Sequence, residues 1–227
     1  MNSVSDKAVL QPQEAPVRKP LLRGIHHLAL NTDDLRGTLD FYVRVLGMPL
    51  VGGLITGGNA ASRSASRGNP PFDHIPHYFL DMGGDSTLAF FEFPKGKAAK
   101  ADRNTLAAMQ HVSFVCGPQR FREMKQRLDR NGVEITFGPK VVMPPNIQSM
   151  YFYDPNGIRL EISADMDGDE ENLEVIRSFR LHADEMRKEL EKVSTDREWI
   201  ESMLASMVDV DPMYHRPEGP NPASEKT

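Results

Sequence analysis

Apolar and polar positions in the first third of the chain alternate in two ways. Period-two alternation predicts a strand over Ile25–Leu30. Apolar residues then return every three or four positions over Asp34–Leu46, which predicts a helix capped by Asn31 or Asp33 and ended by Gly47. Further strands are expected over Met48–Leu54, His77–Asp81 and Thr87–Phe93.

The same order of elements returns in the second third of the chain. A strand is expected over His111–Cys116, followed by a helix that Pro118 opens and Asn131-Gly132 closes. Strand patterns follow over Val133–Phe137, Val141–Met143, Ser149–Tyr153 and Ile158–Ser163, with a turn over 154–157. The order β-α-β-β-β therefore occurs twice, with His27 and His111 at the same point of the two copies. We expect an α+β fold of paired modules.

The regions around the two modules differ in composition. The expected domains are a flexible arm over 1–23, a first module over 24–94 with a loop insert over 52–76, a linker over 95–107, a second module over 108–164 and a helical tail over 165–227. The insert is rich in Gly, Ser and Asn and is long for a simple connection, so we expect a mobile cover over the site.

The tail carries a stripe of apolar residues at helical spacing, at Ile176, Phe179, Ala183, Met186, Leu190 and Val193. Thr195 and Glu198 form a capping box that predicts the start of a second helix. The stripe is short for a coiled coil, so packing on the chain's own domain is favoured over a dimer seam. The stretch from Asp211 is rich in Pro and is expected to be loose.

Composition narrows the classes of protein. The chain has 227 residues, of which 39% are hydrophobic, and a net charge of −5, which argues against a nucleic-acid-binding protein. The single cysteine, Cys116, excludes an intramolecular disulfide framework and is expected to be a packed thiol. We find no apolar run of ~20 residues and no apolar signal core in the first 23 residues, so we expect a cytoplasmic protein without a membrane partner.

Three strands each place one ligand-type residue on a face with small or polar neighbours. Alternate residues of a strand share a face, which sets His27, His111 and Glu161 opposite the apolar faces of their strands. His26 falls on the packing face and is expected to be structural. Two imidazoles and one carboxylate leave open coordination positions, and this set suits Fe(II), or next Mn(II), better than structural zinc.

The segments HLALNTDDLRGTLDFYVRVLGM, HVSFVC and YFYDPNGIRLEIS resemble the vicinal oxygen chelate superfamily, which includes glyoxalase I, fosfomycin-resistance proteins and extradiol dioxygenases. The resemblance implies paired βαβββ modules in an open barrel around one divalent metal. His27, His111 and Glu161 match the ligands of the first, fifth and eighth strands. The fourth-strand position holds Ala89 or Phe90, which cannot bind a metal, and Glu92 fits only if the alignment slips. The resemblance therefore favours members with three protein ligands.

The resemblance also suggests catalytic residues. Tyr151 lies ten residues before Glu161, similar to the extradiol tyrosine that contacts substrate oxygen. Where extradiol enzymes carry an acid–base histidine, this chain has Ser86, and His74 or His77 is the candidate replacement.

The sequence thus predicts a metal-dependent enzyme, most like three-ligand dioxygenases, acting on a small substrate with two neighbouring oxygens. A glyoxalase-like lyase or isomerase, or a fosfomycin-resistance-type transferase, remains an alternative. A third class is a binding protein that sequesters a ligand without catalysis. We expect a small-molecule substrate, no nucleic-acid partner and a homodimer. Whether the two modules close around the metal within one chain or between chains is left open.

Overall fold

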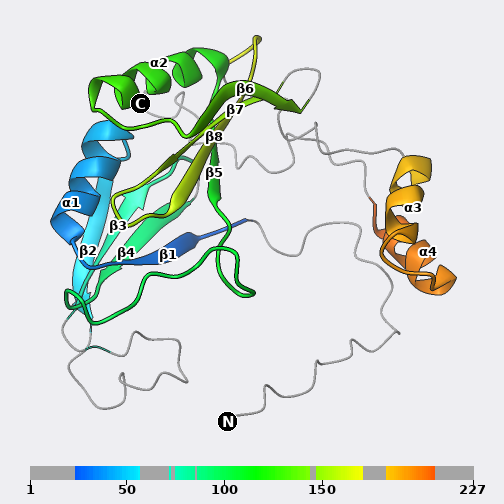
Figure 1. Cartoon of the computed structure of the whole chain (residues 1–227), viewed down its shortest axis with the longest axis horizontal. Coiled ribbons are helices and arrows are strands. Elements are labelled where there is room, and N and C mark those ends of the chain that lie inside the picture. Colours follow the sequence, from blue (N-terminus) through cyan, green and yellow to red (C-terminus); the bar gives the residue numbers. More distant parts are fainter. Residues whose placement is uncertain are drawn as a thin grey trace, which may run out of the picture. The chain divides into compact units, whose positions relative to one another are not determined.

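A computed structural model describes residues 24–56, 72, 75–84, 86–143, 147–170 and 183–207. The described residues fall into two compact units (Figure 1). The first unit lies within residues 24–170 and contains both modules. The second contains the helices within 183–207, and each unit is described by itself.

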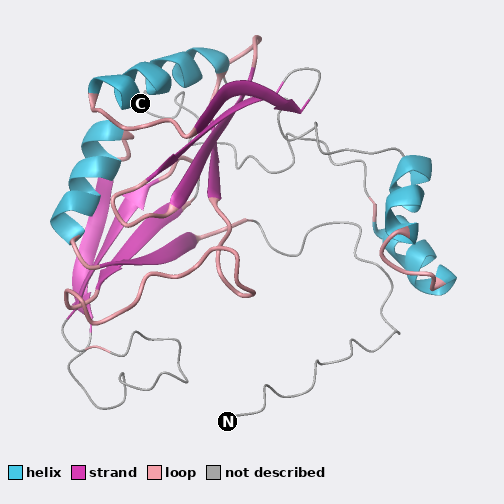
Figure 2. Cartoon of the chain, in the orientation of Figure 1, coloured by secondary structure: helices cyan, strands magenta, loops and turns pink. Residues whose placement is uncertain are grey.

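The first module is a four-stranded sheet with one helical segment after its first strand (Figure 2). Its elements are β1 (His27–Thr32), α1 (Leu35–Leu39), the π-helical continuation η1 (Asp40–Val45), β2 (Leu50–Thr56), β3 (Ile75–Asp81) and β4 (Thr87–Glu92). The strand order is β1-β4-β3-β2, with β1 parallel to β4 and the other pairs antiparallel.

The second module repeats this topology. Its elements are β5 (Val112–Val115), α2 (Pro118–Arg130), β6 (Phe137–Met143), β7 (Ile147–Tyr153) and β8 (Arg159–Asp165). The order is β5-β8-β7-β6, again with a single parallel pair, β5 with β8. The predicted α+β fold of two β-α-β-β-β modules is therefore confirmed.

Some predicted boundaries were wrong. The first helix is capped by Asp34, whose Oδ1 accepts from the Gly37 amide at 3.0 Å, and not by Asn31 or Asp33, because β1 continues through Thr32. The expected strand over Val133–Phe137 begins only at Phe137. The Val133 amide instead donates to the Leu128 carbonyl at 3.0 Å and so completes the end of α2.

The predicted insert 52–76 is also too wide. The β2–β3 ladder pairs Leu54 with His77 and Thr56 with Ile75, so both ends of the predicted loop are strand. Most of the segment between Thr56 and Ile75, and with it the predicted cover over the site, lies outside the described residues.

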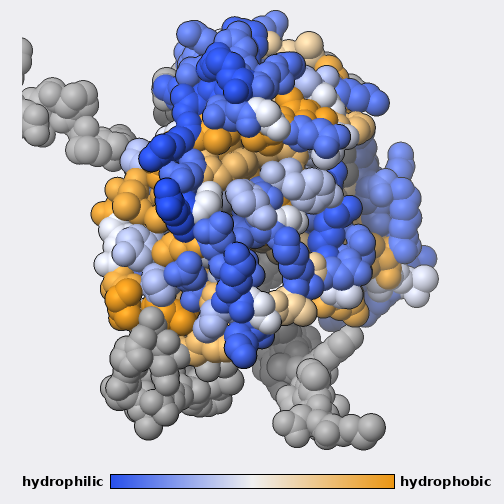
Figure 3. All heavy atoms as spheres, turned by 60° about the vertical axis from the view of Figure 1, so that its left-hand side comes forward, coloured by the Kyte–Doolittle hydropathy of each residue, from blue (hydrophilic) through white to orange (hydrophobic). Residues whose placement is uncertain are grey.

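The two modules share one hydrophobic core. Tyr42 and Phe90 of the first module and Phe152 and Leu160 of the second belong to a single buried cluster. The turn between β7 and β8 joins the modules through polar contacts, since the Tyr42 hydroxyl donates to Asp154 Oδ2 at 3.1 Å. Toward solvent, hydrophilic residues dominate the upper part of Figure 3, where α2 lies, with apolar patches between them.

The second unit is a helical hairpin of α3 (Ala183–Glu191) and α4 (Arg197–Ser206). Leu190 and Ile200 are buried. The predicted restart of the helix is confirmed, although its cap is Asp196 and not Thr195. Ile176 and Phe179 of the predicted stripe lie outside the described residues. Within the described parts of the chain, none of the helices has the length and apolar composition needed to cross a membrane.

Candidate functional site

Each sheet has one face in the shared core and one open face. In β1, Leu28 and Leu30 pack against the core, whereas His27 and Ala29 are exposed. In β5 the exposed positions are Ser113 and Val115. The open faces are the ones on which the strand pattern places the candidate ligands.

Glu161 lies at the centre of a polar cluster on the open face of the second sheet. The side chain is buried, and Oε2 lies 3.0 Å from His111 Nε2. Ser163 donates to Oε1 at 2.9 Å, and Ser149 and Tyr151 also hydrogen-bond the carboxyl group. Register explains this gathering, because β7 and β8 pair Ser149 with Ser163 and Tyr151 with Glu161.

These contacts keep the carboxyl group ionised. Burial raises the pKa of Glu161, but the hydrogen bonds, followed by the charge of His111, act in the opposite direction and outweigh it. The net pKa lies below the ordinary value. A buried carboxylate next to an imidazole is therefore available as a ligand at neutral pH.

Tyr151 is a neutral hydrogen-bond donor in this cluster. Burial, the hydrogen bond with Glu161 and the charge of Glu161 raise the pKa of Tyr151 to about 12. The His111 ring lies edge-on to the Tyr151 ring, with centroids 5.8 Å apart. The Arg159 guanidinium lies 4.1 Å from the centre of the Tyr151 ring and fixes its position by a cation–π contact.

His27 and His77 lie on the open face of the first sheet. His27 Nδ1 is 2.9 Å from Nδ1 of His26, which is exposed, so the expectation of a packed His26 was wrong. The alternation does not extend to His26 because β1 begins at His27. His77 stacks on Phe91 with ring centroids 3.6 Å apart. Burial, and then the charge of His27, lower the pKa of His77, so this imidazole is neutral.

The donor set fits a divalent metal in part. Two donors ~2.1 Å from an ion and at right angles are ~3.0 Å apart, and the His111–Glu161 pair has this separation. Among the described residues, however, no three side chains of His, Cys, Asp or Glu are grouped to hold one ion. The structure thus brings together His111, Glu161 and Tyr151, and it leaves His27 and His77 outside that group.

Glu92 accepts a hydrogen bond from the backbone at the start of α1. Its Oε1 accepts from the amide of Leu35 at 2.9 Å, at the start of α1, so it does not act as a fourth ligand on the open face. The Ser86 hydroxyl donates to the carbonyl of Ile25. His74 lies outside the described residues. Cys116 is partly buried, and burial raises its thiol pKa to about 12, as expected for a packed cysteine.

Two residues of the Glu161 cluster, Ser163 and Ser149, were not predicted as site residues from the sequence. Ser163 follows Glu161 by two positions on the same strand face, so the alternation pattern contains the signal for it. Ser149 is brought to Glu161 by the β7–β8 register, which the sequence pattern does not specify.

Comparisons with known proteins agree with this architecture. A protein-family model of the glyoxalase/bleomycin resistance protein/dioxygenase superfamily matches residues 24–162. A relative named as a ring-cleaving dioxygenase, MhqA of Bacillus subtilis (strain 168), is 27% identical over 153 residues, which cover 65% of this chain and 42% of that protein. The chain thus spans less than half of this curated relative.

Solved structures are also similar. A glyoxalase/dioxygenase from Nostoc punctiforme shares 24% identity with a TM-score of 0.48, over 72% of this chain and all of that chain. A glyoxalase/bleomycin resistance protein/dioxygenase domain from Frankia sp. EAN1pec shares 19% identity with a TM-score of 0.49, over 65% of this chain and 96% of that chain. On the family-model match, which covers more than half of its length, this chain belongs to the glyoxalase/bleomycin resistance protein/dioxygenase superfamily.

Proposed function

We propose that the chain is a metal-dependent enzyme acting on a small substrate that offers two neighbouring oxygens. His111 and Glu161 serve as metal ligands, and the partner subunit's His27 completes the set in a homodimer. The observation that carries this proposal is the ionised, buried carboxylate of Glu161, 3.0 Å from His111 Nε2 and hydrogen-bonded by a neutral tyrosine.

Exposed apolar side chains on the open faces support completion by a second chain. Leu54 on the first sheet is 51% exposed, and Val115 and Phe137 on the second are 50% and 43% exposed. Large apolar side chains gathered on open faces are typical of surfaces that bind a partner. A homodimer that joins the first sheet of one chain to the second sheet of the other would bury them and bring His27 to the Glu161 cluster.

The side chains around the metal position have separate roles. The metal supplies Lewis acidity toward substrate oxygens when it is bound. Tyr151 is protonated at neutral pH, and we propose that it exchanges its hydrogen bond with Glu161 for one to a bound substrate oxygen, while Arg159 holds its ring in place. His77 is a neutral imidazole beside His27 and serves as the proton acceptor.

Dioxygenase activity is the specific reaction that we propose. The ring-cleaving name of the Bacillus subtilis relative supports it, and Fe(II), or next Mn(II), suits two imidazoles, one carboxylate and open positions. A set of three protein ligands is also supported because the Glu92 carboxylate, the candidate fourth ligand, accepts from the Leu35 amide at the start of α1. A lyase, isomerase or transferase would use the same ligands without consuming oxygen, and a sequestering protein would need no metal.

The test is anaerobic loading with Fe(II), followed by metal analysis and oxygen uptake with a series of catechols. Wild type should hold one ion per chain and consume oxygen with at least one substrate, whereas Glu161→Gln should lose most of the metal and keep its fold. Stoichiometric metal without oxygen uptake would contradict the dioxygenase and leave the non-redox enzyme. Full metal occupancy in the Glu161→Gln protein would overturn the ligand assignment.

A further inference from the structure

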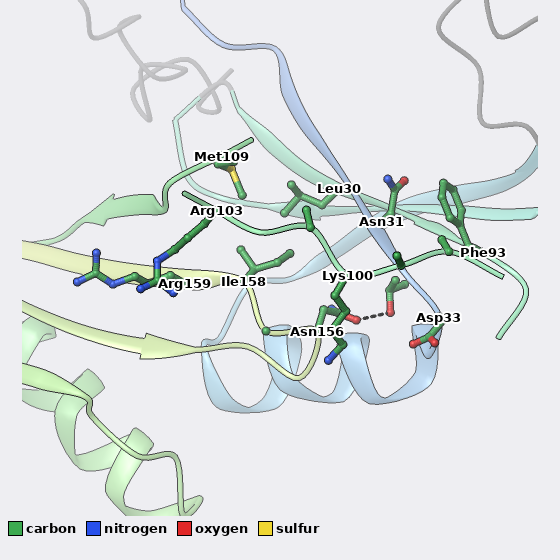
Figure 4. A pocket seen from close by; sticks show the side chains of 15 residues that line it. Leu30, Asn31, Asp33, Phe93, Lys100, Arg103, Met109, Asn156, Ile158 and Arg159 are labelled. Atoms are coloured by element: carbon green, nitrogen blue, oxygen red, sulfur yellow. Dashed lines mark hydrogen bonds between the residues drawn. The ribbon is translucent and has the colours of Figure 1, made fainter. Parts of the chain in front are cut away.

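A cavity of about 350 Å³ lies outside the Glu161 cluster. It is bounded by the end of β1, the segment that links β4 to β5, and the start of β8 (Figure 4). Cavities that bind small organic ligands begin at about this size. None of the candidate metal ligands lines it, so it is a separate feature of the first unit.

The charged side chains of the cavity are predominantly cationic. Lys100, Arg103 and Arg159 line it, against a single carboxylate, Asp33. Figure 4 places Arg103 and Arg159 toward one end of the view and Asp33 toward the other. Among the described residues, no carboxylate lies within 4.0 Å of any of these three cations. Their charges are therefore available to an anion from solution.

The two arginines are held in place by tyrosines, not by acids. Arg103 Nη1 donates to the Tyr153 hydroxyl at 2.8 Å, and the Arg159 guanidinium lies over the Tyr151 ring. Such contacts fix a guanidinium but leave most of its five N–H donors for a carboxylate, which guanidinium groups bind in a two-pronged geometry. This preorganisation lowers the entropy cost of binding an anion.

The rest of the lining is largely apolar. Leu30, Met109 and Ile158 approach one another in Figure 4, with Phe93 further along. Asn156 hydrogen-bonds Thr32 and Asp154, so its polar groups are already used within the protein. A ligand that fits this cavity has an apolar body and one anionic end.

We propose that this cavity binds a small organic monocarboxylate with an aromatic or aliphatic body. A monoanion is favoured over a phosphate dianion because Asp33 shares the cavity and would repel the second charge. Arg159 connects the cavity to the Glu161 cluster, since it lies two residues before Glu161 on the same strand face. The binding does not depend on the proposed function, and it is tested without metal.

Calorimetry on the metal-free full-length protein with 3-phenylpropionate tests the proposal. The carboxylate should bind at least about tenfold more tightly than 3-phenylpropan-1-ol, which has the same body without the charge. The double variant Lys100→Gln/Arg103→Gln should lose about tenfold in affinity or more. Lys97→Gln, a lysine on the same segment outside the cavity lining, should bind like wild type, as should Glu161→Gln.

The methyl resonances of the methionines locate the ligand. Met109 lines this cavity, whereas Met48 and Met124 line another cavity of about 360 Å³ in the same unit. Titration of methyl-¹³C-methionine protein should shift Met109, assigned by Met109→Leu, and leave Met48 and Met124 in place. Equal affinity for the alcohol, tighter binding of phenyl phosphate, an equal loss in Lys97→Gln, or shifts confined to Met48 and Met124 would each overturn the proposal.

Discussion

At the scale of single residues, the proposed site is centred on a buried glutamate that stays ionised. An isolated carboxylate taken out of water would be protonated or unstable. Glu161 avoids this because hydroxyl donors from β7 and β8 surround it and His111 lies beside it. A carboxylate held in this way is oriented as well as ionised, and both properties are required of a metal ligand.

The hydroxyl of Ser163 should therefore affect metal binding. Ser163→Ala removes the donor at 2.9 Å from Oε1, and loss of such a supporting contact typically costs ~10- to 100-fold in metal affinity. Ser113→Ala is the matched control, because Ser113 contacts Ser163 at 3.2 Å and is not among the described side chains that hydrogen-bond Glu161. Competition with a metal chelator measures both affinities. Equal losses in the two variants would show that general polarity, and not support of Glu161, matters here.

At the scale of elements, the turn between β7 and β8 joins the two modules. Asp154 accepts from its own turn through the amides of Asn156 and Ile158, at 2.9 and 2.8 Å. It also accepts from Tyr42 across the core, and Asn156 accepts from Thr32 of β1. The Asp-Pro-Asn-Gly sequence thus closes a tight turn and binds the first module.

Tyr42→Phe should destabilise the fold by about 1 kcal/mol, the net value of one buried hydrogen bond. The effect should be measured by urea unfolding at neutral pH. In the Asp154→Asn background, Tyr42→Phe should lower the free energy of unfolding by less, because the carboxylate that accepts from Tyr42 has been replaced by an amide. Equal losses in both backgrounds would mean that the Tyr42–Asp154 contact does not couple the modules.

Asp154 should also make stability depend on pH. Burial raises its pKa, and its hydrogen bonds reverse this only in part. A raised pKa in the folded state contributes stability that is fully present below the unfolded value near ~4 and is lost as pH rises through the folded value. Wild type should therefore lose stability relative to Asp154→Asn as pH rises from about 4 through the folded-state pKa. A difference that is constant over this range would refute the assignment.

The sequence predicts the strand faces and the ends of one helix, but it does not predict the long-range contacts of the fold and the candidate site. Period-two alternation identifies the open faces of β1, β5 and β8, because one face of each strand must enter the core. Pro118 and Gly132 predict the ends of α2 through local backbone preferences. The contact between Tyr42 and Asp154 spans 112 residues, and no local preference encodes it. The approach of Ser149 to Glu161 likewise depends on strand register.

At the scale of the whole molecule, the described residues present two separate open faces. One carries His27 and His77, and the other carries His111, Glu161 and Tyr151. The face of each sheet that lies opposite its candidate ligands packs into the shared core. The two groups of candidate ligands can therefore form one site only through contact with another molecule. We infer that this molecule is a second copy of the chain, with two equivalent metal sites in each dimer.

Metal analysis of mixed dimers tests this central claim most directly. His27→Ala and His111→Ala chains, carrying different tags, are coexpressed, and the heterodimer is purified through both tags. Each homodimer should hold little metal. The heterodimer should hold about one ion per dimer, because one of its two sites combines an intact His27 from one chain with an intact His111 and Glu161 from the other. A heterodimer as empty as the homodimers, or a wild-type protein that is monomeric with one ion per chain, would contradict the account.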